Sequence, residues 1–341
     1  MVTKLDTEDF LVQSAGRLLI DVRSPAEYLH GHIPGALSFP LFSNEERTVI
    51  GTCYKQQGRE AAMMLGLKYY GINMQQIVTT LKKVTSDKQV FVHCWRGGMR
   101  SGVVAWMLDL FGYRVAVLNK GYKAFRKAVL ESFSMPKNIM ILGGKTGSAK
   151  TEVLHELQSQ GESVIDLEAL AHHKGSAFGG INESAAPAQE QFENELFMQF
   201  RTVGSQKTIW LEDESQRIGS INLPNALWMQ MRNARVIYLD IPFEKRLSYI
   251  VDSYGSFGVT ALKEATLRIA KRLGGLETRN AIKFLEDGDI RSAFSIFLKY
   301  YDKYYTSATQ KRDPDLIHKI ISEKINARGN ALLIRQSKIF Y

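Results

Sequence analysis

The sequence predicts an α/β protein of 341 residues with two successive parallel sheets and a mainly helical C-terminal part. Two segments, 90–112 and 138–159, carry this prediction, because each passes from a short apolar strand through a glycine-containing loop into a helix. Helical periodicity dominates after residue 243. Further apolar strands that alternate with helical segments extend the second sheet, and they lie at 163–168, 208–213 and 235–241.

Composition narrows the class of protein. Hydrophobic residues make up 45% of the chain, and no apolar run approaches the roughly 20 residues that span a bilayer. The two cysteines, Cys53 and Cys94, are too few for a disulfide framework, and residues 1–10 are polar without an apolar stretch behind them. We therefore expect a cytoplasmic protein without a membrane role.

The formal net charge of +9 is unevenly distributed along the chain. Residues 1–136 carry 17 basic and 11 acidic side chains, residues 137–242 carry 9 and 13, and residues 243–341 carry 18 and 11. Two basic flanks around an acidic middle are typical of a protein that binds a polyanion such as RNA, although a solvated basic surface explains the pattern almost as well.

The segment VFVHCWRGGMRSG, residues 90–102, predicts an anion-binding loop around a reactive cysteine. An apolar strand ends at His93, and glycines in the following loop allow backbone N–H groups to turn inward. The N-terminus of the next helix and two arginines add positive charge, which favours an anion and the thiolate form of a cysteine. We predict Cys94 as the nucleophile, with an anion loop made of Arg96, Gly97, Gly98 and Arg100.

Two chemistries fit the spacing of Cys94 and Arg100. A cysteine followed by five residues and an arginine suits a cysteine-dependent phosphatase, whose loop wraps a phosphate. The same loop suits a transferase in which the cysteine carries sulfur or selenium. The spacing alone does not decide between them.

Four motifs, taken together, favour the transferase by resemblance. DVRSPAEY at 21–28, GHIPGA at 31–36, the VHC strand and VAVLNKGYKAF at 115–125 resemble the rhodanese domain and follow its order. This resemblance implies an α/β domain over residues 1–134, with Cys94 as its active cysteine.

A phosphate-binding loop is predicted at GGKTGSAKT, residues 143–151, because a strand, a glycine loop and a helix together let backbone amides cradle phosphates. Counted from Gly144 the pattern is G-x4-A-K-T, with Ala149 where the usual motif has glycine, and the alanine is unfavourable only if its position needs positive φ. Lys150 would contact the phosphates, and Thr151 a phosphate or Mg²⁺. The predicted diphosphate-binding residues are Gly144, Lys145, Thr146, Gly147, Ser148, Lys150 and Thr151.

Strand TIWLED at 208–213 ends in Asp213, a possible Walker B-like residue. The carboxyl ends of parallel strands meet at one edge of a sheet, so Asp213 would lie near the loop and could orient Mg²⁺. An ion-paired or helix-capping carboxylate is an equal alternative. The adjacent His172 and His173 cannot both face one site from a regular element, so they do not predict a metal centre, and the metal content stays open.

Longer segments resemble the tRNA 2-selenouridine synthases, and this resemblance covers nearly the whole chain. Cys53 lies in one of the segments, and we leave its role open. The strings are unusual ones: GTCYKQQGREAA at 51–62, DLEALAHHKGSAFGG at 166–180, QEQFENEL at 189–196 and EDESQRIGSINLP at 212–224.

The predicted domains are a rhodanese-like domain at 1–134, a P-loop α/β domain of kinase type at 135–242 and a mainly helical part at 243–341. The last is the helical continuation of the P-loop half. It contains KYYDKYY at 299–305, which interleaves lysines with tyrosines. Such a face can contact tRNA by holding phosphates and stacking bases, although tyrosines at helical spacing are more often core.

The resemblance implies a transferase that acts on the wobble 2-thiouridine of tRNA in two steps. The first adds a geranyl group from geranyl diphosphate to the sulfur, and the second replaces the geranylthio group with selenium from selenophosphate, which Cys94 holds as a selenylsulfide. Both donors are substrates, so no tightly bound cofactor is expected, and Mg²⁺ is a possible requirement. We expect tRNA as the partner, with an enzyme that supplies selenophosphate as a possible second one.

Two other functions stay open. A P-loop NTPase or kinase with a rhodanese-like sulfurtransferase or phosphatase module would turn over nucleotides without tRNA. An RNA-binding protein in which Cys94 is incidental would leave the modification intact when Cys94 is replaced.

Overall fold

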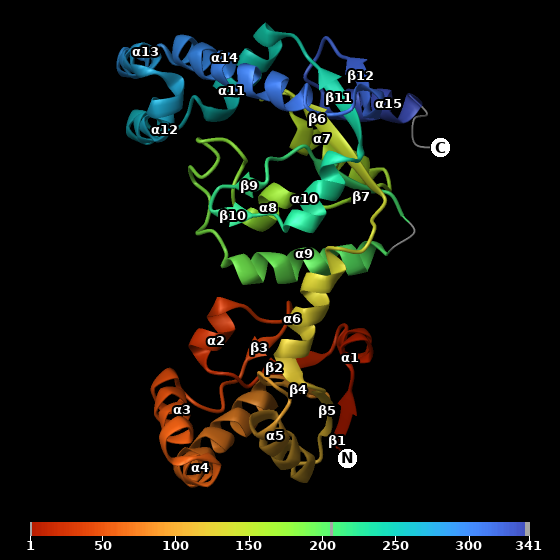
Figure 1. Cartoon of the computed structure of the whole chain (residues 1–341), viewed down its shortest axis with the longest axis vertical. Helices are drawn as coiled ribbons and strands as arrows, with labels where there is room; N and C mark the ends of the chain where they lie inside the picture. The colour runs from red at the N-terminus through yellow and green to blue at the C-terminus, as the bar shows by residue number, and fades with distance from the viewer. Residues whose placement is uncertain (1, 205–206, 338–341) are drawn as a thin grey trace. The chain divides into compact units, whose positions relative to one another are not determined.

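The computed structural model describes residues 2–204 and 207–337. The described chain forms two compact units (Figure 1), of which the first contains residues 2–132 and 193–197 and the second contains the rest. The predicted P-loop domain and the predicted helical part, which meet at residue 242, both belong to the second unit. The domain boundaries drawn from the sequence stay predictions.

The first unit is built on a parallel sheet with the strand order β1-β5-β4-β2-β3. In the central strand β4, Val90, Phe91 and Val92 are fully buried, as expected of a parallel strand that is covered on both faces. Asp21 at the end of β2 is in register with His93 at the end of β4, so the residues that follow both strands meet at one edge. The strands are β1 (Val2–Leu5), β2 (Leu18–Asp21), β3 (Leu37–Ser38), β4 (Gln89–His93) and β5 (Arg114–Leu118).

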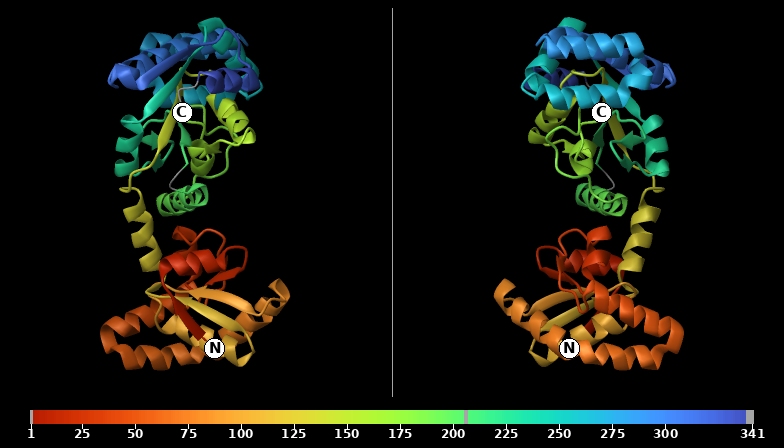
Figure 2. Two further views of the ribbon diagram at one scale, coloured as in Figure 1. Left: turned by 90° about the vertical axis from the view of Figure 1, so that its right-hand side faces the viewer. Right: turned by 90° about the vertical axis from the view of Figure 1, so that its left-hand side faces the viewer.

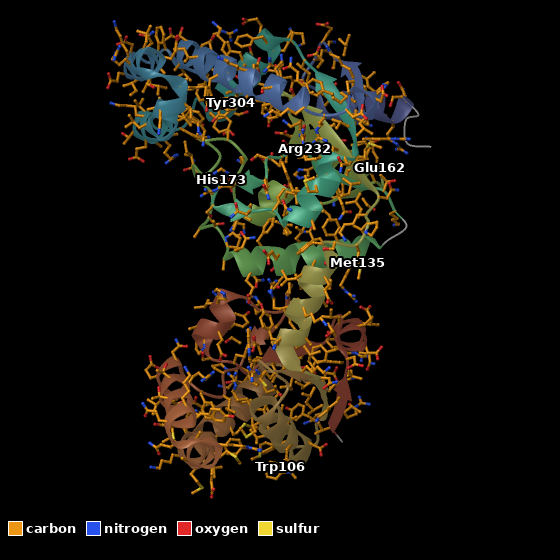
Figure 3. The ribbon with its side chains drawn as sticks, viewed as in Figure 1. Trp106, Met135, Glu162, His173, Arg232 and Tyr304 are labelled. Atoms are coloured by element: carbon orange, nitrogen blue, oxygen red, sulfur yellow. The ribbon has the colours of Figure 1, made fainter. Side chains whose placement is uncertain are left out.

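Helices connect these strands. The connection between β3 and β4 is a helical hairpin that begins at a capping box, where Ser43 and Glu46 exchange hydrogen bonds between side chain and backbone N–H. The helix after β4 confirms the predicted strand–loop–helix segment. Its residue Trp106, labelled in Figure 3, is exposed. The helices are α1 (Thr7–Ser14), α2 (Pro25–His30), α3 (Asn44–Gln57), α4 (Arg59–Val84), α5 (Met99–Leu110) and α6 (Gly121–Ser132).

The second unit contains a parallel sheet with the order β12-β11-β6-β8-β7. Its central strand β6 pairs with β8 so that Leu142 is in register with Glu212, which brings the ends of both strands to one edge. A small antiparallel pair, β9 and β10, follows β8. The strands are β6 (Ile139–Gly144), β7 (Ser163–Val164), β8 (Ile209–Glu212), β9 (Arg217–Ile218), β10 (Ile221–Asn222), β11 (Arg235–Asp240) and β12 (Ile317–Ile321).

Two strands differ from the sequence prediction. The strand predicted at 163–168 stops early as β7, because Asp166 caps the next helix by accepting a 2.8 Å hydrogen bond from its backbone. Strand β12 lies in the part predicted as mainly helical. It is an edge strand in which only Ile317 and Ile320 are half-buried, so it lacks the continuous apolar run of a central strand.

Helices α11 to α14 gather at one end of the second unit, as Figures 1 and 2 show, and form a helical cluster with its own core. None of the helices within the described ranges is long and apolar enough to cross a lipid bilayer. The helices of the second unit are α7 (Lys150–Ser159), α8 (Leu167–Ala171), α9 (Gln189–Val203, shared with the first unit), α10 (Asn225–Arg232), α11 (Phe243–Tyr254), α12 (Val259–Leu273), α13 (Gly275–Glu286), α14 (Ile290–Thr309) and α15 (Ala327–Gln336).

Candidate functional site

Cys94 begins the loop that joins β4 to α5. Its side chain is 3% exposed, and Sγ lies 3.1 Å from Oγ of Ser101 in the first turn of α5. The hydroxyl of Ser101 also lies within 3.3 Å of the carbonyl oxygen of Gly98, to which it can donate. The sulfur therefore lies at the N-terminus of a helix, where the helix dipole favours negative charge.

The shape of this loop depends on two glycines. Gly97 has φ +62°, and a Cβ there would lie 2.5 Å from the carbonyl oxygen of Leu118. Gly121 has φ +61°, and a Cβ there would collide with the carbonyl oxygen of Cys94. That carbonyl accepts a 2.8 Å hydrogen bond from the backbone of Tyr122. The loop is thus held against the start of α6, and a side chain at either glycine would displace it.

The two arginines of the loop have different surroundings. Arg100 forms a bidentate ion pair with Glu27, with N–O distances of 2.6 and 3.2 Å. Arg96 is exposed. Because Glu27 already offsets the charge of Arg100, Arg96 and the backbone N–H groups of the loop are the groups best placed to hold an incoming anion.

A buried ion network lies beneath the loop. Asp21 accepts hydrogen bonds from Arg23, the shortest of them 2.6 Å, and both side chains are almost fully buried. The guanidinium of Arg23 also stacks over the ring of Tyr122, 3.8 Å from its centroid. His93 is fully buried 3.7 Å from Asp21, and burial lowers its pKa to about 4. This network fixes the strand end from which Cys94 projects.

The second loop joins β6 to α7. Ala149 has φ +55°, a left-handed conformation that costs an alanine about 1 kcal/mol. Its position therefore has the positive φ that disfavours alanine in place of glycine. The hydroxyl of Ser148 is buried and has no hydrogen-bond partner within the described residues, so a phosphate oxygen bound in the loop could provide one.

Lys150 and Thr151 both contact Glu212 at the end of β8. Nζ of Lys150 lies 3.3 Å from one carboxylate oxygen, and the hydroxyl of Thr151 donates to the other over 2.9 Å. Burial alone would lower the pKa of Lys150, but Tyr305 and nearby carboxylates raise it above its ordinary value. The lysine is therefore a permanent positive charge at the loop.

Three buried carboxylates, those of Glu168, Glu212 and Glu214, surround this point. Oxygens from each lie within 4.8 Å of one another, an arrangement that could hold a metal ion. Burial and the charge of Glu212 raise the pKa values of Glu168 and Glu214. The sequence prediction missed these residues, because Glu212 ends β8, Glu214 lies beyond that strand and Glu168 comes from helix α8.

Asp213 is ion-paired, which is the second of the two roles that the sequence left open. Its carboxylate forms an ion pair of 2.5 Å with Arg312, which is 5% exposed and also donates to the carbonyl oxygen of Met231. Asp213 therefore anchors the chain between α14 and β12. The acid beside Lys150 is Glu212, one position earlier in the sequence.

Arg246 on α11 is hydrogen-bonded to the backbone of the second loop. It is 2% exposed, and it donates to the carbonyl oxygens of Thr146 and Ile241, each over 3.0 Å. Two further hydrogen bonds of 2.9 and 2.7 Å join it to Asp302 on α14. The sequence carries no motif that singles out this arginine, because its partners come from distant segments.

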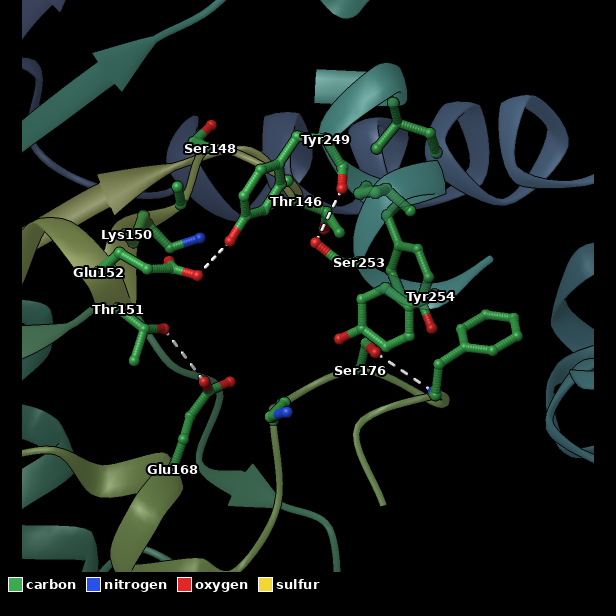
Figure 4. A pocket seen from close by; sticks show the side chains of 18 of the residues that line it. Thr146, Ser148, Lys150, Thr151, Glu152, Glu168, Ser176, Tyr249, Ser253 and Tyr254 are labelled. Atoms are coloured by element: carbon green, nitrogen blue, oxygen red, sulfur yellow. Dashed lines mark hydrogen bonds between the residues drawn. The ribbon is translucent and has the colours of Figure 1, made fainter. Parts of the chain in front are cut away.

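A cavity of about 500 Å³ extends from the second loop into the helical cluster. Figure 4 shows Lys150, Thr151 and Glu168 on one side of it, and Tyr254 and Ser176 on the other. Five of the predicted diphosphate-binding residues line it, whereas Gly144 ends β6 and Lys145 lies 4.0 Å from Asp302. Its remaining wall is largely aromatic and aliphatic, and it includes Ile250, Phe257, Phe178, Phe294, Phe297 and Leu298.

The tyrosines of KYYDKYY divide between two surroundings. Tyr301 and Tyr305 line the cavity. Tyr304 is 51% exposed (Figure 3), and Lys299 and Lys303 on the same helix are also exposed. The motif is therefore partly a cavity wall and partly a basic surface.

Comparison with known proteins gives the following matches. Residues 137–264 match the family model described as the tRNA 2-selenouridine synthase AAA domain, and residues 6–128 match the rhodanese-like domain. The first match covers the loop around Lys150 and the acids of β8. The second covers Cys94 and its loop.

Several relatives named tRNA 2-selenouridine synthase are similar to this chain. The protein of Bordetella bronchiseptica is 31% identical over 96% of this chain and 100% of its own length. That of Shewanella denitrificans is 36% identical over 80% of this chain and 77% of its own. That of Nitrosomonas europaea is 35% identical over 69% of this chain, and the match spans 63% of that relative.

Proposed function

Because the chain belongs to the family of tRNA 2-selenouridine synthases, we propose that it replaces the sulfur of 2-thiouridine in tRNA by selenium in two steps. In the first step the sulfur attacks geranyl diphosphate, a C–S bond forms, and diphosphate leaves with the electron pair of the broken C–O bond. In the second step Cys94 attacks the phosphorus of selenophosphate, the P–Se bond breaks and selenium leaves as selenide. The selenide forms a C–Se bond at the carbon that carries the geranylthio group, and geranylthiolate leaves with the electron pair of the broken C–S bond. Water then releases phosphate from Cys94.

The observation that carries this proposal is the chemical division of the cavity. One end has a helix N-terminus, a permanently charged lysine and the hydroxyl of Thr151, which suit a diphosphate. The other end consists mainly of carbon atoms from the helical cluster, including Phe294, Phe297 and Leu298. A ligand with a diphosphate head and a hydrocarbon tail matches both ends.

Lys150 would offset the charge that develops on the departing diphosphate. Backbone N–H groups of the loop and the hydroxyl of Ser148 would hold the phosphate oxygens. Glu168, Glu212 and Glu214 are the residues that would hold Mg²⁺, and the ion would offset the remaining phosphate charge.

The Cys94 loop suits the second donor. Selenophosphate is a small anion, and the loop offers Arg96, backbone N–H groups and the N-terminus of α5. Geranylation prepares the tRNA for this step, because a thioether sulfur leaves more readily than the sulfur of the unmodified base.

Mass analysis of tRNA nucleosides tests the proposal with two single variants. Lys150→Ala should fail to geranylate thiolated tRNA but should still convert tRNA that is already geranylated. Cys94→Ala should geranylate normally and accumulate the geranylated base, because its defect lies in the second step. Normal geranylation by Lys150→Ala, or a requirement for ATP hydrolysis, would refute this assignment and favour a nucleotide-dependent P-loop enzyme.

A further inference from the structure

We infer that Phe178 sets the length of the hydrocarbon tail that the cavity accepts and makes the site selective for a ten-carbon chain. The inference rests on the proposed function, since it takes a prenyl diphosphate as the ligand. It adds a specificity-determining residue and a limit on the class of donor.

The segment from Lys174 to Phe178 passes from the polar end of the cavity to its apolar end. At the polar end, a Cβ on Gly175 would lie 2.5 Å from an oxygen of Glu168 and 3.1 Å from one of Glu214. Three residues later, Phe178 is 3% exposed and belongs to the core of the helical cluster. One short segment therefore contacts the carboxylates and also closes the tail region.

Phe178 is part of a wall of rings. Its ring centroid lies 4.8 Å from that of Phe297 and 5.5 Å from that of Phe294. Tyr254 packs against it edge-on at 6.5 Å. Rings that pack on each other in this way leave little room for a chain to pass between them.

The backbone around Phe178 is fixed by two helices. The N–H of Ala177 donates to the hydroxyl of Tyr301 on α14 over 2.9 Å, and its carbonyl accepts from Arg268 on α12 over 3.1 Å. The N–H of Phe178 donates to the hydroxyl of Ser176 over 3.2 Å. A longer tail could not push this wall aside without breaking these hydrogen bonds.

The size of the cavity is sufficient for a ten-carbon donor. Geranyl diphosphate has about 19 non-hydrogen atoms, which need on the order of 500 Å³ when each takes nearly the volume of a water molecule. The cavity measures about 500 Å³. A farnesyl tail adds about five carbons, and removal of the Phe178 ring would free on the order of 100 Å³ for them.

Calorimetric titration of the full-length protein tests the inference with inorganic diphosphate and with dimethylallyl, geranyl and farnesyl diphosphates. The wild type should bind geranyl diphosphate at least about 100-fold more tightly than inorganic diphosphate, because the tail is buried. It should bind farnesyl diphosphate at least about 10-fold more weakly than the geranyl compound. Phe178→Ala should reverse the order of the geranyl and farnesyl compounds.

Leu285→Ala is the matched control. Leu285 is fully buried in the same helical core but does not line the cavity, so its removal should loosen the core and keep the wild-type order. If Phe178→Ala does not fold, two other variants replace it. Phe178→Leu should reduce the preference for the geranyl over the farnesyl compound. Leu298→Trp fills the cavity and should shift the preference toward the dimethylallyl compound.

The outcomes separate this inference from the proposed function. The inference would be overturned if the wild type bound all the diphosphates with equal affinity, or if the Phe178 variants kept the wild-type order of affinities. Either result would do so even if geranyl transfer to tRNA occurs. Tail-selective binding without transfer to the sulfur of tRNA would support the inference and refute the proposed function.

Discussion

The hydroxyl of Thr151 donates a 2.9 Å hydrogen bond to the carboxylate of Glu212 and so joins the start of α7 to the end of β8. Lys150 lies 3.3 Å from the other oxygen of the same carboxylate. The positive charge of the loop is therefore already opposed by an acid. Because Glu168 and Glu214 lie within 4.8 Å of Glu212, an incoming diphosphate meets three carboxylates as well as one lysine.

This arrangement predicts that diphosphate binding depends on a divalent cation. Without the ion, the phosphates lose a positive charge that offsets their own and face the carboxylate of Glu212. The binding of inorganic diphosphate should therefore weaken at least about 10-fold, measured by calorimetry before and after chelation. Glu214→Gln removes one oxygen ligand of the ion and should reduce the dependence. Asp240→Asn, outside the cavity lining, should leave it unchanged, and equal affinity with and without Mg²⁺ would contradict the prediction.

Ala149 provides a test of backbone strain. Because its φ is +55°, Ala149→Gly should relieve strain and raise the free energy of unfolding of the second unit by about 0.5 kcal/mol after the entropic cost of glycine. Ala169→Gly, inside helix α8, should lower that free energy by about 0.5–1 kcal/mol. Urea unfolding checks both variants, and a loss of stability in Ala149→Gly would show that the strain is absent.

The parts of the fold that the sequence predicted are those with local patterns. The segments around Cys94 and Lys150 each combine an apolar strand, a glycine loop and a helix within about 25 residues, so neighbouring residues determine them. Strand β12 forms by pairing with β11. Most of its residues are exposed, so its sequence lacks the apolar pattern by which a strand is predicted. Pairing between distant segments cannot be predicted from the few residues that surround each position.

The candidate site shows the same limit. Lys150 and Cys94 could be identified because their loops have recognisable glycine spacing. Asp213 and Glu212 are adjacent, and only the structure shows which of them lies beside Lys150. Arg312, which pairs with Asp213, is 99 residues away in sequence. The wall around Phe178 is formed by residues from three segments, so no local pattern could predict it.

The buried His93 predicts a specific dependence of stability on pH. Its pKa is about 4 in the folded protein and 6.5 in the unfolded chain, so protonation favours unfolding. The stability that depends on a neutral imidazole is complete above pH 6.5 and is lost as the pH falls toward 4, by about 3 kcal/mol in total.

Hydrogen exchange of the β4 amides, corrected for the intrinsic effect of pH, measures this loss. His93→Gln should remove most of the pH dependence between pH 6.5 and 4, because glutamine does not titrate there. His318→Gln changes an exposed histidine on β12 and should leave the dependence in place. Identical profiles for the wild type and His93→Gln would refute the assignment.

The last prediction separates two roles of Arg246, which pairs with Asp302 and donates to the carbonyl oxygen of Thr146. Arg246→Met should lower the free energy of unfolding by about 3 kcal/mol, because Asp302 loses the partner of a largely buried ion pair. It should also weaken the binding of inorganic diphosphate, because the loop loses the donor that holds Thr146.

The double variant Arg246→Met/Asp302→Leu distinguishes these effects. An apolar pair of similar size should restore most of the stability, since neither charge of the buried pair is left without the other and Lys145 is partly exposed to solvent. It cannot donate to Thr146 and should not restore diphosphate affinity. Arg291→Met breaks an exposed ion pair between the same two helices and should change either quantity by less than about 0.5 kcal/mol. The free energy of unfolding and the diphosphate affinity are measured on all three variants. If diphosphate affinity returns together with stability in the double variant, Arg246 acts only through the ion pair, and the loop does not depend on its hydrogen bond.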